Sequence, residues 1–258
     1  MMDLNPTFRE RLTASRRPLF GGWLCSGSPV VTEIMAGSGL DWLLIDMEHA
    51  PNGLESVLVQ LQVLAGYPVT AVVRVPEGSP VIIKQVLELG AQNLMVPMIS
   101  TPEQAVEISQ AAQYPPAGIR GVGAPMARSA RWNRVGDYLS RAAGQVSVYV
   151  QIETAEGVAN AREIAAVPGI DGVLVGPADL AASMGMIGEH DHPEVLTAVR
   201  QVFAEVRAAG KSVGVNSFEP GAARDFAAAG AAFVLVGADV LLIAAASDQL
   251  ASDFIANP

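Results

Sequence analysis

The chain has 258 residues, half of them hydrophobic and 16% charged, and it contains a single cysteine. This composition excludes a disordered chain, a collagen-like fibre and a disulfide scaffold, and it supplies enough apolar residues for a large core. The net charge of -10 argues against a nucleic-acid partner, because phosphate binding requires a basic surface. A small anionic metabolite would need a local positive centre.

The expected cellular setting follows from the cysteine content and the ends of the chain. Cys25 cannot form an intrachain disulfide, which favours a reducing, cytoplasmic location. Residues 1–20 include acidic side chains and lack an apolar stretch of signal-peptide length. The apolar residues 233–246 are interrupted by Asp239 and are too few to span a bilayer. We therefore expect a cytoplasmic protein without a membrane partner, in which Cys25 is a packed small residue rather than a nucleophile.

Short aliphatic runs alternate with helical patterns along the whole chain. A helix over residues 6–14 comes first. The predicted strands cover residues 21–25, 42–47, 71–75, 94–98, 148–152, 172–175, 213–215 and 233–236. The predicted helices between and after them cover residues 30–37, 54–64, 80–89, 102–113, 156–167, 193–209, 220–229 and 241–254. Most of the strand runs are continuously apolar, which is typical of strands buried on both faces of a parallel sheet.

Eight strands that alternate with eight helices in a chain of this length predict one (β/α)8 TIM barrel, a single domain over residues 1–258, capped by the N-terminal helix. A doubly wound open sheet is the alternative. Such a sheet normally has a glycine-rich phosphate turn after its first strand, whereas Gly21 and Gly22 lie inside the strand. The barrel is therefore the favoured architecture.

A long insertion, residues 114–141, separates the fourth and fifth strands. It contains Arg120, Arg128, Arg131 and Arg134 in a chain whose net charge is negative. Long ordered insertions in barrels are usually functional or interfacial. We favour such a role over a solvated loop.

The polar residues that close the apolar runs are the candidates for chemistry, because a (β/α)8 barrel builds its active site at the C-terminal ends of its strands. In chain order they are Asp46, Glu48, His49, Arg74, Gln151, Glu153, Asp179, Asn216 and Asp239. A base, a cation and several carboxylates are thus expected on one rim.

Glu153 and Asp179 close neighbouring strands and can share a divalent metal through their carboxylate oxygens. Oxygen-only coordination favours Mg²⁺ or Mn²⁺ over a thiolate zinc site. The alternatives are a helix N-cap for Asp179 and a structural ion pair for Glu153. His190 and His192 flank Asp191, where a solvated surface explains them better than a metal site does.

His49 and Arg74 complete the predicted catalytic set. Histidine suits general-base chemistry near neutral pH, and Asp46 or Glu48 could orient the imidazole of His49; a structural histidine is the alternative. Arg74 stands among apolar residues, and a buried unpaired charge is costly, so it requires an anionic partner, either a protein carboxylate or a substrate. Its fixed charge suits a carbonyl that becomes an enolate.

The two lysines of the chain are poorly placed for covalent catalysis. Lys84 lies early in a predicted helix, and Lys211 precedes the seventh strand, at the face of the barrel opposite the expected site. A Schiff-base aldolase needs a lysine at the rim or in the barrel interior. The sequence therefore disfavours imine and pyridoxal phosphate chemistry and favours a metal-assisted enolate.

The rim segments also carry a family resemblance that extends from about Gly21 to Ala245. The segments that carry it are residues 42–49 (WLLIDMEH), 96–98 (VPM), 118–123 (GIRGVG), 131–134 (RWNR), 151–153 (QIE) and 176–180 (GPADL). In this order they closely resemble the class II, metal-dependent pyruvate aldolases of the HpcH/HpaI family, the 4-hydroxy-2-oxoheptanedioate and 2-dehydro-3-deoxyglucarate aldolase type.

The resemblance implies roles for individual residues. Glu153 and Asp179 match the ligands of a divalent metal (Mg²⁺, Mn²⁺ or Co²⁺), His49 the base, Asp46 its acidic partner, and Arg74 the cation that faces the keto oxygen. Substrate contacts are expected from Trp23, Arg74, Gln151, Gly176, Pro177, Ala178, Asp179 and Asn216, with the backbone amides of Ala178 and Asp179 on the pyruvate carboxylate. Asn216 replaces an apolar residue of the aldehyde pocket.

Assembly is implied in the same way. Glu88 matches an acidic residue that reaches a neighbouring subunit's site, although glutamate is longer than the expected aspartate. The family forms hexamers, trimers of dimers with exchanged C-terminal helices, and the apolar residues 240–246 are compatible with that exchange.

The expected activity is a reversible, metal-dependent aldol cleavage of a 4-hydroxy-2-oxo acid into pyruvate and an aldehyde, with a place in aromatic catabolism. Hydroxypyruvate as an alternative donor stays open. One rival interpretation is a lyase for malyl or citramalyl coenzyme A esters, and another is a keto-acid-binding barrel without catalysis.

Overall fold

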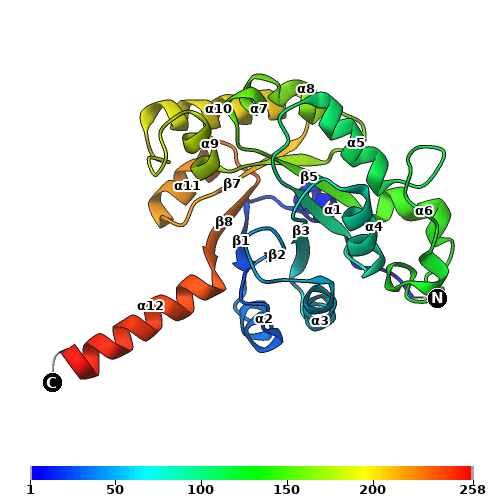
Figure 1. Cartoon of the computed structure of the whole chain (residues 1–258), viewed down its shortest axis with the longest axis horizontal. Helices are drawn as coiled ribbons and strands as arrows, with labels where there is room; N and C mark the ends of the chain where they lie inside the picture. Colours follow the sequence, from blue (N-terminus) through cyan, green and yellow to red (C-terminus); the bar gives the residue numbers. More distant parts are fainter. Residues whose placement is uncertain (1, 257–258) are drawn as a thin grey trace.

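A computed structural model describes residues 2–256. Its centre is a closed barrel of eight parallel strands in which each strand pairs with its neighbours in chain order and β8 pairs with β1 (Figure 1). The strands are β1 (Leu19–Leu24), β2 (Trp42–Asp46), β3 (Thr70–Arg74), β4 (Asn93–Val96), β5 (Ser147–Ile152), β6 (Gly172–Val175), β7 (Ser212–Asn216) and β8 (Phe233–Ala238). The predicted (β/α)8 barrel is confirmed.

Helices surround the barrel and follow most of its strands (Figure 1). They are α1 (Phe8–Ala14), α2 (Pro29–Ala36), α3 (Leu54–Leu64), α4 (Pro80–Glu88), α5 (Pro102–Ala112), α6 (Tyr138–Gln145), α7 (Ala155–Ala159), α8 (Ala161–Ala166), α9 (Pro177–Ser183), α10 (Pro193–Ala208), α11 (Pro220–Ala228) and α12 (Asp239–Ala251). Several begin with a side-chain cap followed by proline. Thr101, for example, caps α5 by accepting a hydrogen bond from the amide of Gln104.

The single helix predicted over residues 156–167 is two helices in the structure. α7 ends and α8 begins at Asn160, whose side-chain Nδ2 donates to the carbonyl of Ser100 at 2.8 Å. The backbone of Asn160 departs from helical angles, with φ of -100° and ψ of 10°, which divides the helix at this residue. The structure also contains α6 inside the insertion, a helix that the sequence pattern did not indicate.

The N-terminal helix closes one end of the barrel, as expected. Phe8 of α1 is fully buried against Trp42, Tyr149 and Phe233, with ring centroids 4.9–5.3 Å apart. The backbone amide of Phe8 donates to Oδ1 of Asn93, at the start of β4, at 2.6 Å. This aromatic plug fills the barrel interior at its N-terminal end, and barrels of this kind build their active sites at the C-terminal end.

The insertion between α5 and β5 is an ordered substructure rather than a solvated loop. Ala124, Ala130, Val135 and Tyr138 form a small buried cluster of their own. Three successive residues, Arg131 to Asn133, adopt left-handed backbone angles with φ between 50° and 64°. The segment therefore holds a defined shape on the outside of the barrel.

The C-terminal helix α12 extends away from the barrel (Figure 1, red). Its apolar side chains are exposed, including Leu242 and Ile243, and Phe254 in the turn of π-helix that follows it is 72% exposed. Exchange of this helix between subunits stays a prediction. Among the residues that the structure describes, no helix is long and apolar enough to cross a membrane.

Candidate active site

Polar side chains from five strands meet at the C-terminal end of the barrel and line a cavity of about 360 Å³, which we call the rim pocket. Parallel register explains the convergence, since Asp46 is paired with Arg74, and Ile152 with Val175, so that Glu153 follows beside Gly176. The predicted site residues that line the pocket are Trp23, Asp46, His49, Arg74, Gln151, Glu153, Gly176, Pro177, Ala178, Asp179 and Asn216.

Arg74 is the best-anchored side chain in the rim pocket and is only 6% exposed. Its Nε and Nη2 donate to the two carboxylate oxygens of Asp46 at 2.8 and 2.9 Å, a bidentate pair. Its Nη1 lies 2.9 Å from Oε2 of Glu48. The guanidinium also stacks on Trp23, 4.2 Å from the ring centroid. The anionic partner that the sequence required is therefore supplied by two protein carboxylates.

Trp23 links Arg74 to the far wall of the pocket. Its indole Nε1 donates to Oδ1 of Asn216 at 2.8 Å. The ring is thus held between a cation on one side and an amide on the other. Asn216, at the end of β7, belongs to the same contact network as the arginine.

Glu153 is buried and is fixed at both oxygens. The backbone amide of Met98 donates to Oε1 at 2.8 Å, and Nε2 of Gln151 donates to Oε2 at 2.9 Å. The pKa of Glu153 is raised to about 7 by burial and by the charges of Asp179 and Glu48, against the lowering effects of the Met98 hydrogen bond and the charge of Arg74. A buried carboxyl among other carboxylates calls for a cation beside it.

Glycine at position 176 makes room for that carboxylate. A Cβ built on Gly176 would lie 2.6 Å from Oε2 of Glu153, so no larger residue fits beside the acid without moving it. Among residues 2–256, no group of three or more His, Cys, Asp or Glu side chains is placed to hold a metal ion. The donor set that Glu153 and Asp179 offer is two carboxylates, which suits a hard divalent cation that takes its other ligands from substrate and water.

His49 stands at the mouth of the pocket with its side chain 66% exposed. Its Nε2 lies 3.8 Å from Oε2 of Glu48. The resemblance implies that Asp46 pairs with this ring, whereas the structure gives the Asp46 oxygens to Arg74 and to the backbone amides of Glu48 and His49, at 3.0 and 3.3 Å. The carboxylate beside the imidazole is thus that of Glu48. Its pKa is raised by burial, against the opposing charges of Arg74 and His49.

Comparison with known proteins identifies the family of the chain. The family model described as HpcH/HpaI aldolase/citrate lyase matches residues 19–246. The chain belongs to the HpcH/HpaI aldolase family. It is an enzyme of the aldolase class, a carbon–carbon lyase.

Individual members of the HpcH/HpaI family are similar over nearly the whole chain. A hydroxypyruvate/pyruvate aldolase of Deinococcus radiodurans is 51% identical over 98% of this chain and 92% of its own. A 4-hydroxy-2-oxo-heptane-1,7-dioate aldolase of Escherichia coli is 48% identical over 96% and 94%. A crystal structure of a family protein from Burkholderia cenocepacia, 42% identical, covers 95% of this chain and 97% of its own with a TM-score of 0.91.

Glu88, a site residue implied by the resemblance, lies outside the rim pocket of its own chain. It ends α4, where its two carboxylate oxygens accept hydrogen bonds from Arg120 Nη2 at 2.7 Å and from Ser129 Oγ at 2.9 Å. Arg120 is itself buried and stacks on Tyr114, 4.5 Å from the ring centroid. Within one subunit Glu88 therefore anchors the insertion to the barrel, and a role in a neighbouring site stays a prediction.

Several residues of the pocket were not foreseen from the sequence. Phe218, Val240 and Leu241 form its apolar wall, and they follow β7 and β8 by two or three residues. The only hint in the sequence was that these three residues follow closely after predicted strands, whose C-terminal ends form the rim. Asp239, which the sequence placed on the rim, is buried and accepts hydrogen bonds from the backbone amides of Cys25 and Ser26, at 2.8 and 3.1 Å. It holds the first loop rather than facing substrate.

Cys25 lines the rim pocket of this HpcH/HpaI aldolase but should be unreactive. Burial, with the charges of Asp46 and Asp239, raises the pKa of its thiol to about 12, so native thiolate at pH 8 should be about 10³-fold scarcer than in an ordinary cysteine. We expect iodoacetamide labelling, followed by mass spectrometry, to be at least about 10²-fold slower in native protein than in urea. Comparable rates in the two states would contradict the assignment.

Proposed function

We propose that the protein catalyses the reversible, divalent-metal-dependent aldol cleavage of a 4-hydroxy-2-oxo acid into pyruvate and an aldehyde. The printed names of its relatives, a 4-hydroxy-2-oxo-heptane-1,7-dioate aldolase and a hydroxypyruvate/pyruvate aldolase, support this substrate class. They also support hydroxypyruvate as a second donor. Neither Lys84 nor Lys211 lines the rim pocket, which supports an enolate route over an imine formed on lysine.

The observation that carries the proposal is the charge of the rim pocket. Within the described chain, its lining and direct contacts include the carboxylates Asp46, Glu48, Glu153 and Asp179 against the single guanidinium of Arg74. An anionic 2-oxo acid would be repelled from such a pocket. Glu153 and Asp179 would hold a divalent cation, which would reverse the local field and supply Lewis-acid polarisation of a carbonyl group. The metals we propose are Mg²⁺, Mn²⁺ or Co²⁺.

The residues of the chain itself supply the remaining functions. His49, open to solvent and near Glu48, takes the proton from the C4 hydroxyl as the C3–C4 bond breaks and the aldehyde departs. The electron pair left on C3 forms the pyruvate enolate, whose negative charge the guanidinium of Arg74 would stabilise. A proton delivered to C3 then completes pyruvate. The first amides of α9, at Ala178 and Asp179, orient the substrate carboxylate, because helix N-termini present unpaired N–H groups.

Arg74→Lys should separate the geometry of this cation from its charge. Lysine keeps one positive charge but loses the bidentate grip on Asp46 and the stacking on Trp23. We expect kcat/KM for aldol cleavage to fall about 10- to 10²-fold, the scale of one or two lost charged hydrogen bonds. Arg162→Lys, on the outer surface, is the matched control. An unchanged kcat/KM in Arg74→Lys would show that the geometry of Arg74 is not needed for the reaction.

The function itself is tested by incubating the metal-loaded enzyme with 4-hydroxy-2-oxo acids and measuring pyruvate released. Pyruvate and hydroxypyruvate are then offered with a panel of aldehydes in the reverse direction. Exchange of the pyruvate methyl protons with deuterated solvent reports enolate formation without any aldehyde. Cleavage of malyl or citramalyl coenzyme A esters in place of the oxo acids would overturn the substrate class. Pyruvate binding without methyl exchange would indicate a barrel that binds but does not catalyse.

We propose further that the working enzyme is a cytoplasmic homo-oligomer, a hexamer built as a trimer of dimers, whose α12 helices are exchanged between subunits. The exposed apolar side chains of α12 support this, because contiguous apolar side chains on the surface of a protein usually mark an interface. We expect Leu242→Glu with Ile243→Glu to lower the mass measured by light scattering. Glu substitutions at the polar positions Ser247 and Gln249 are the control. An unchanged mass would place the interface elsewhere.

A further inference from the structure

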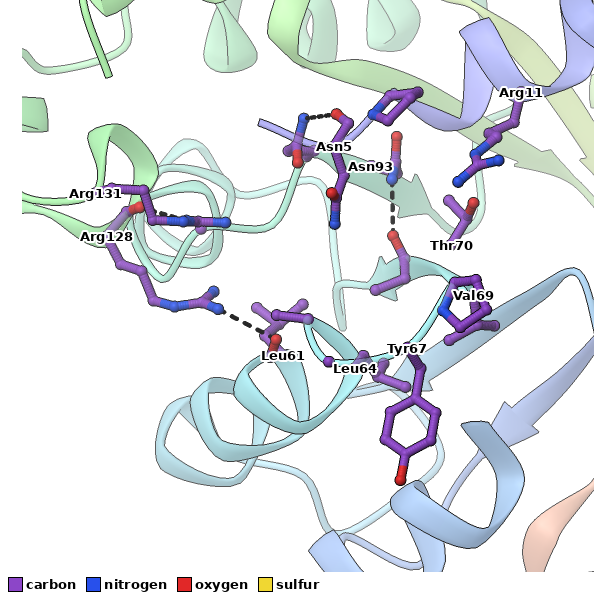
Figure 2. Close-up of a pocket in the computed structure, with 17 residues that line it drawn as sticks. Asn5, Arg11, Leu61, Leu64, Tyr67, Val69, Thr70, Asn93, Arg128 and Arg131 are labelled. Carbon is purple, nitrogen blue, oxygen red and sulfur yellow. Dashed lines mark hydrogen bonds between the residues drawn. The ribbon is translucent and has the colours of Figure 1, made fainter. Parts of the chain in front are cut away.

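A second cavity, of about 200 Å³, lies at the end of the barrel opposite the rim pocket, and we call it the basal cavity (Figure 2). Thr70 and Asn93, which begin β3 and β4, form its floor, and Asn5 of the N-terminal segment lies beside them. Arg128 and Arg131 reach it from the insertion. Three separate parts of the chain thus enclose one space that the aldol reaction does not use.

The basal cavity is strongly cationic in a protein whose net charge is -10. Arg11, Arg128 and Arg131 line it, and no aspartate or glutamate is among its described lining residues. The hydrogen bonds of the Arg128 side chain go to backbone carbonyls, that of Leu89 at 3.0 Å and that of Leu61 at 3.2 Å (Figure 2). These acceptors satisfy hydrogen bonds but leave the positive charge without a counter-charge.

The two insertion arginines converge on one point of the backbone. A Cβ built on Gly90 would lie 2.7 Å from Nη1 of Arg128 and 2.8 Å from Nη1 of Arg131. Gly90 has φ of 92°, so glycine is required here for its backbone angle as well as for this space. Nη1 of Arg131 also donates to the carbonyl of Arg128 at 2.6 Å, which fixes the two side chains together.

Such a pair of like charges is unfavourable without an anion. Arg128 is 9% exposed, and its pKa is lowered to about 10, mainly by burial and also by the charge of Arg131. Burial also lowers the pKa of Arg131. Both effects describe positive charges that are removed from water and placed near each other with no carboxylate between them.

We propose that the basal cavity binds a small oxyanion, a phosphate or a carboxylate, between the guanidinium groups of Arg128 and Arg131. Guanidinium forks match two oxygens of such an ion, and the ion supplies the missing counter-charge. The side chains of Asn5 and Thr70 add uncharged hydrogen-bond donors at the wall of the cavity. Because the aromatic plug around Phe8 separates the two ends of the barrel, this site does not compete with substrate at the rim.

Thermal melting and calorimetric titration of the intact, metal-loaded protein test the proposal. Inorganic phosphate and succinate are the probes, with sodium chloride at equal ionic strength as the reference for screening. We expect one or both oxyanions to bind saturably and to raise the melting temperature by roughly 2–4 °C at several times the dissociation constant. Which of the two binds more tightly identifies the source of the oxyanion.

Substitutions assign the binding to this cavity. Arg131→Gln should weaken the preferred oxyanion at least tenfold, whereas Arg141→Gln, an exposed arginine on α6, should bind as the wild type does. Arg11→Gln, on α1 at the edge of the cavity, gives a second and smaller loss if Arg131→Gln fails to fold. A response no larger than that to chloride, or equal binding by all of these variants, would overturn the site. Each readout is independent of aldol turnover.

Discussion

Glu153→Gln is expected to lower kcat/KM for aldol cleavage by at least about 10³-fold and to weaken the binding of Mn²⁺ in a direct titration. The amide is nearly isosteric and can still accept the hydrogen bond from Met98, so the fold should persist. It cannot offer an anionic oxygen to a divalent cation. A lost cation removes several kcal/mol of stabilisation from a developing enolate, which corresponds to a rate effect of this size.

Two comparisons make that experiment decisive. Glu156→Gln removes a carboxylate three residues along the chain, on the exposed side of α7, and should leave turnover and metal binding unchanged. Wild-type protein stripped with a chelator should lose turnover and regain it with Mg²⁺ or Mn²⁺, whereas Glu153→Gln should not be restored by the same metal. Full turnover in stripped wild-type protein would exclude a metal-dependent reaction.

His49→Ala is expected to reduce kcat for aldol cleavage by about 10²- to 10⁴-fold, the usual cost of losing a general base. The ring is mostly exposed and is not packed in the core, so the melting temperature should change little. KM should also change little, because the carboxylate and keto groups of the substrate are held by other residues. The measurement is steady-state cleavage, with melting followed in parallel.

The control for His49→Ala is His190→Ala, which removes an exposed imidazole from the loop before α10. It should retain wild-type kcat. Glu48→Gln is informative beside it, since Glu48 lies next to the imidazole and contacts Arg74. If His49→Ala kept a near-normal kcat, the histidine would be assigned to structure and the proton transfer to another group.

The barrel could be predicted because its strands are continuously apolar and helices alternate with them. Runs such as Leu43 to Ile45 are fully buried, as that pattern indicates. The division of one predicted helix at Asn160 left no mark in the local pattern, and the side chain at this point contacts Ser100, which is 60 residues away in the sequence. Boundaries set by distant contacts leave no mark in the local periodicity.

The membership of the rim pocket could be predicted because parallel strands bring their C-terminal ends to one side of a barrel. Which of these side chains pair with one another could not be predicted. The sequence left Asp46 and Glu48 as alternative partners of His49, and the resemblance implied Asp46, yet strand register places Asp46 directly beside Arg74. Continuously apolar strands carry no alternation from which register can be derived, so these partners emerge only from the folded barrel.

Helix α12 both lines the rim pocket and exposes an apolar surface outside the barrel. Val240 and Leu241, in its first turn, form part of the apolar wall of the rim pocket, while the rest of the helix extends outward from the barrel. The position of this first turn therefore shapes the apolar wall of the pocket. In the exchanged oligomer that we propose, the contacts of α12 with a neighbouring subunit would also act on the pocket at Val240 and Leu241, which would couple acceptor preference to assembly.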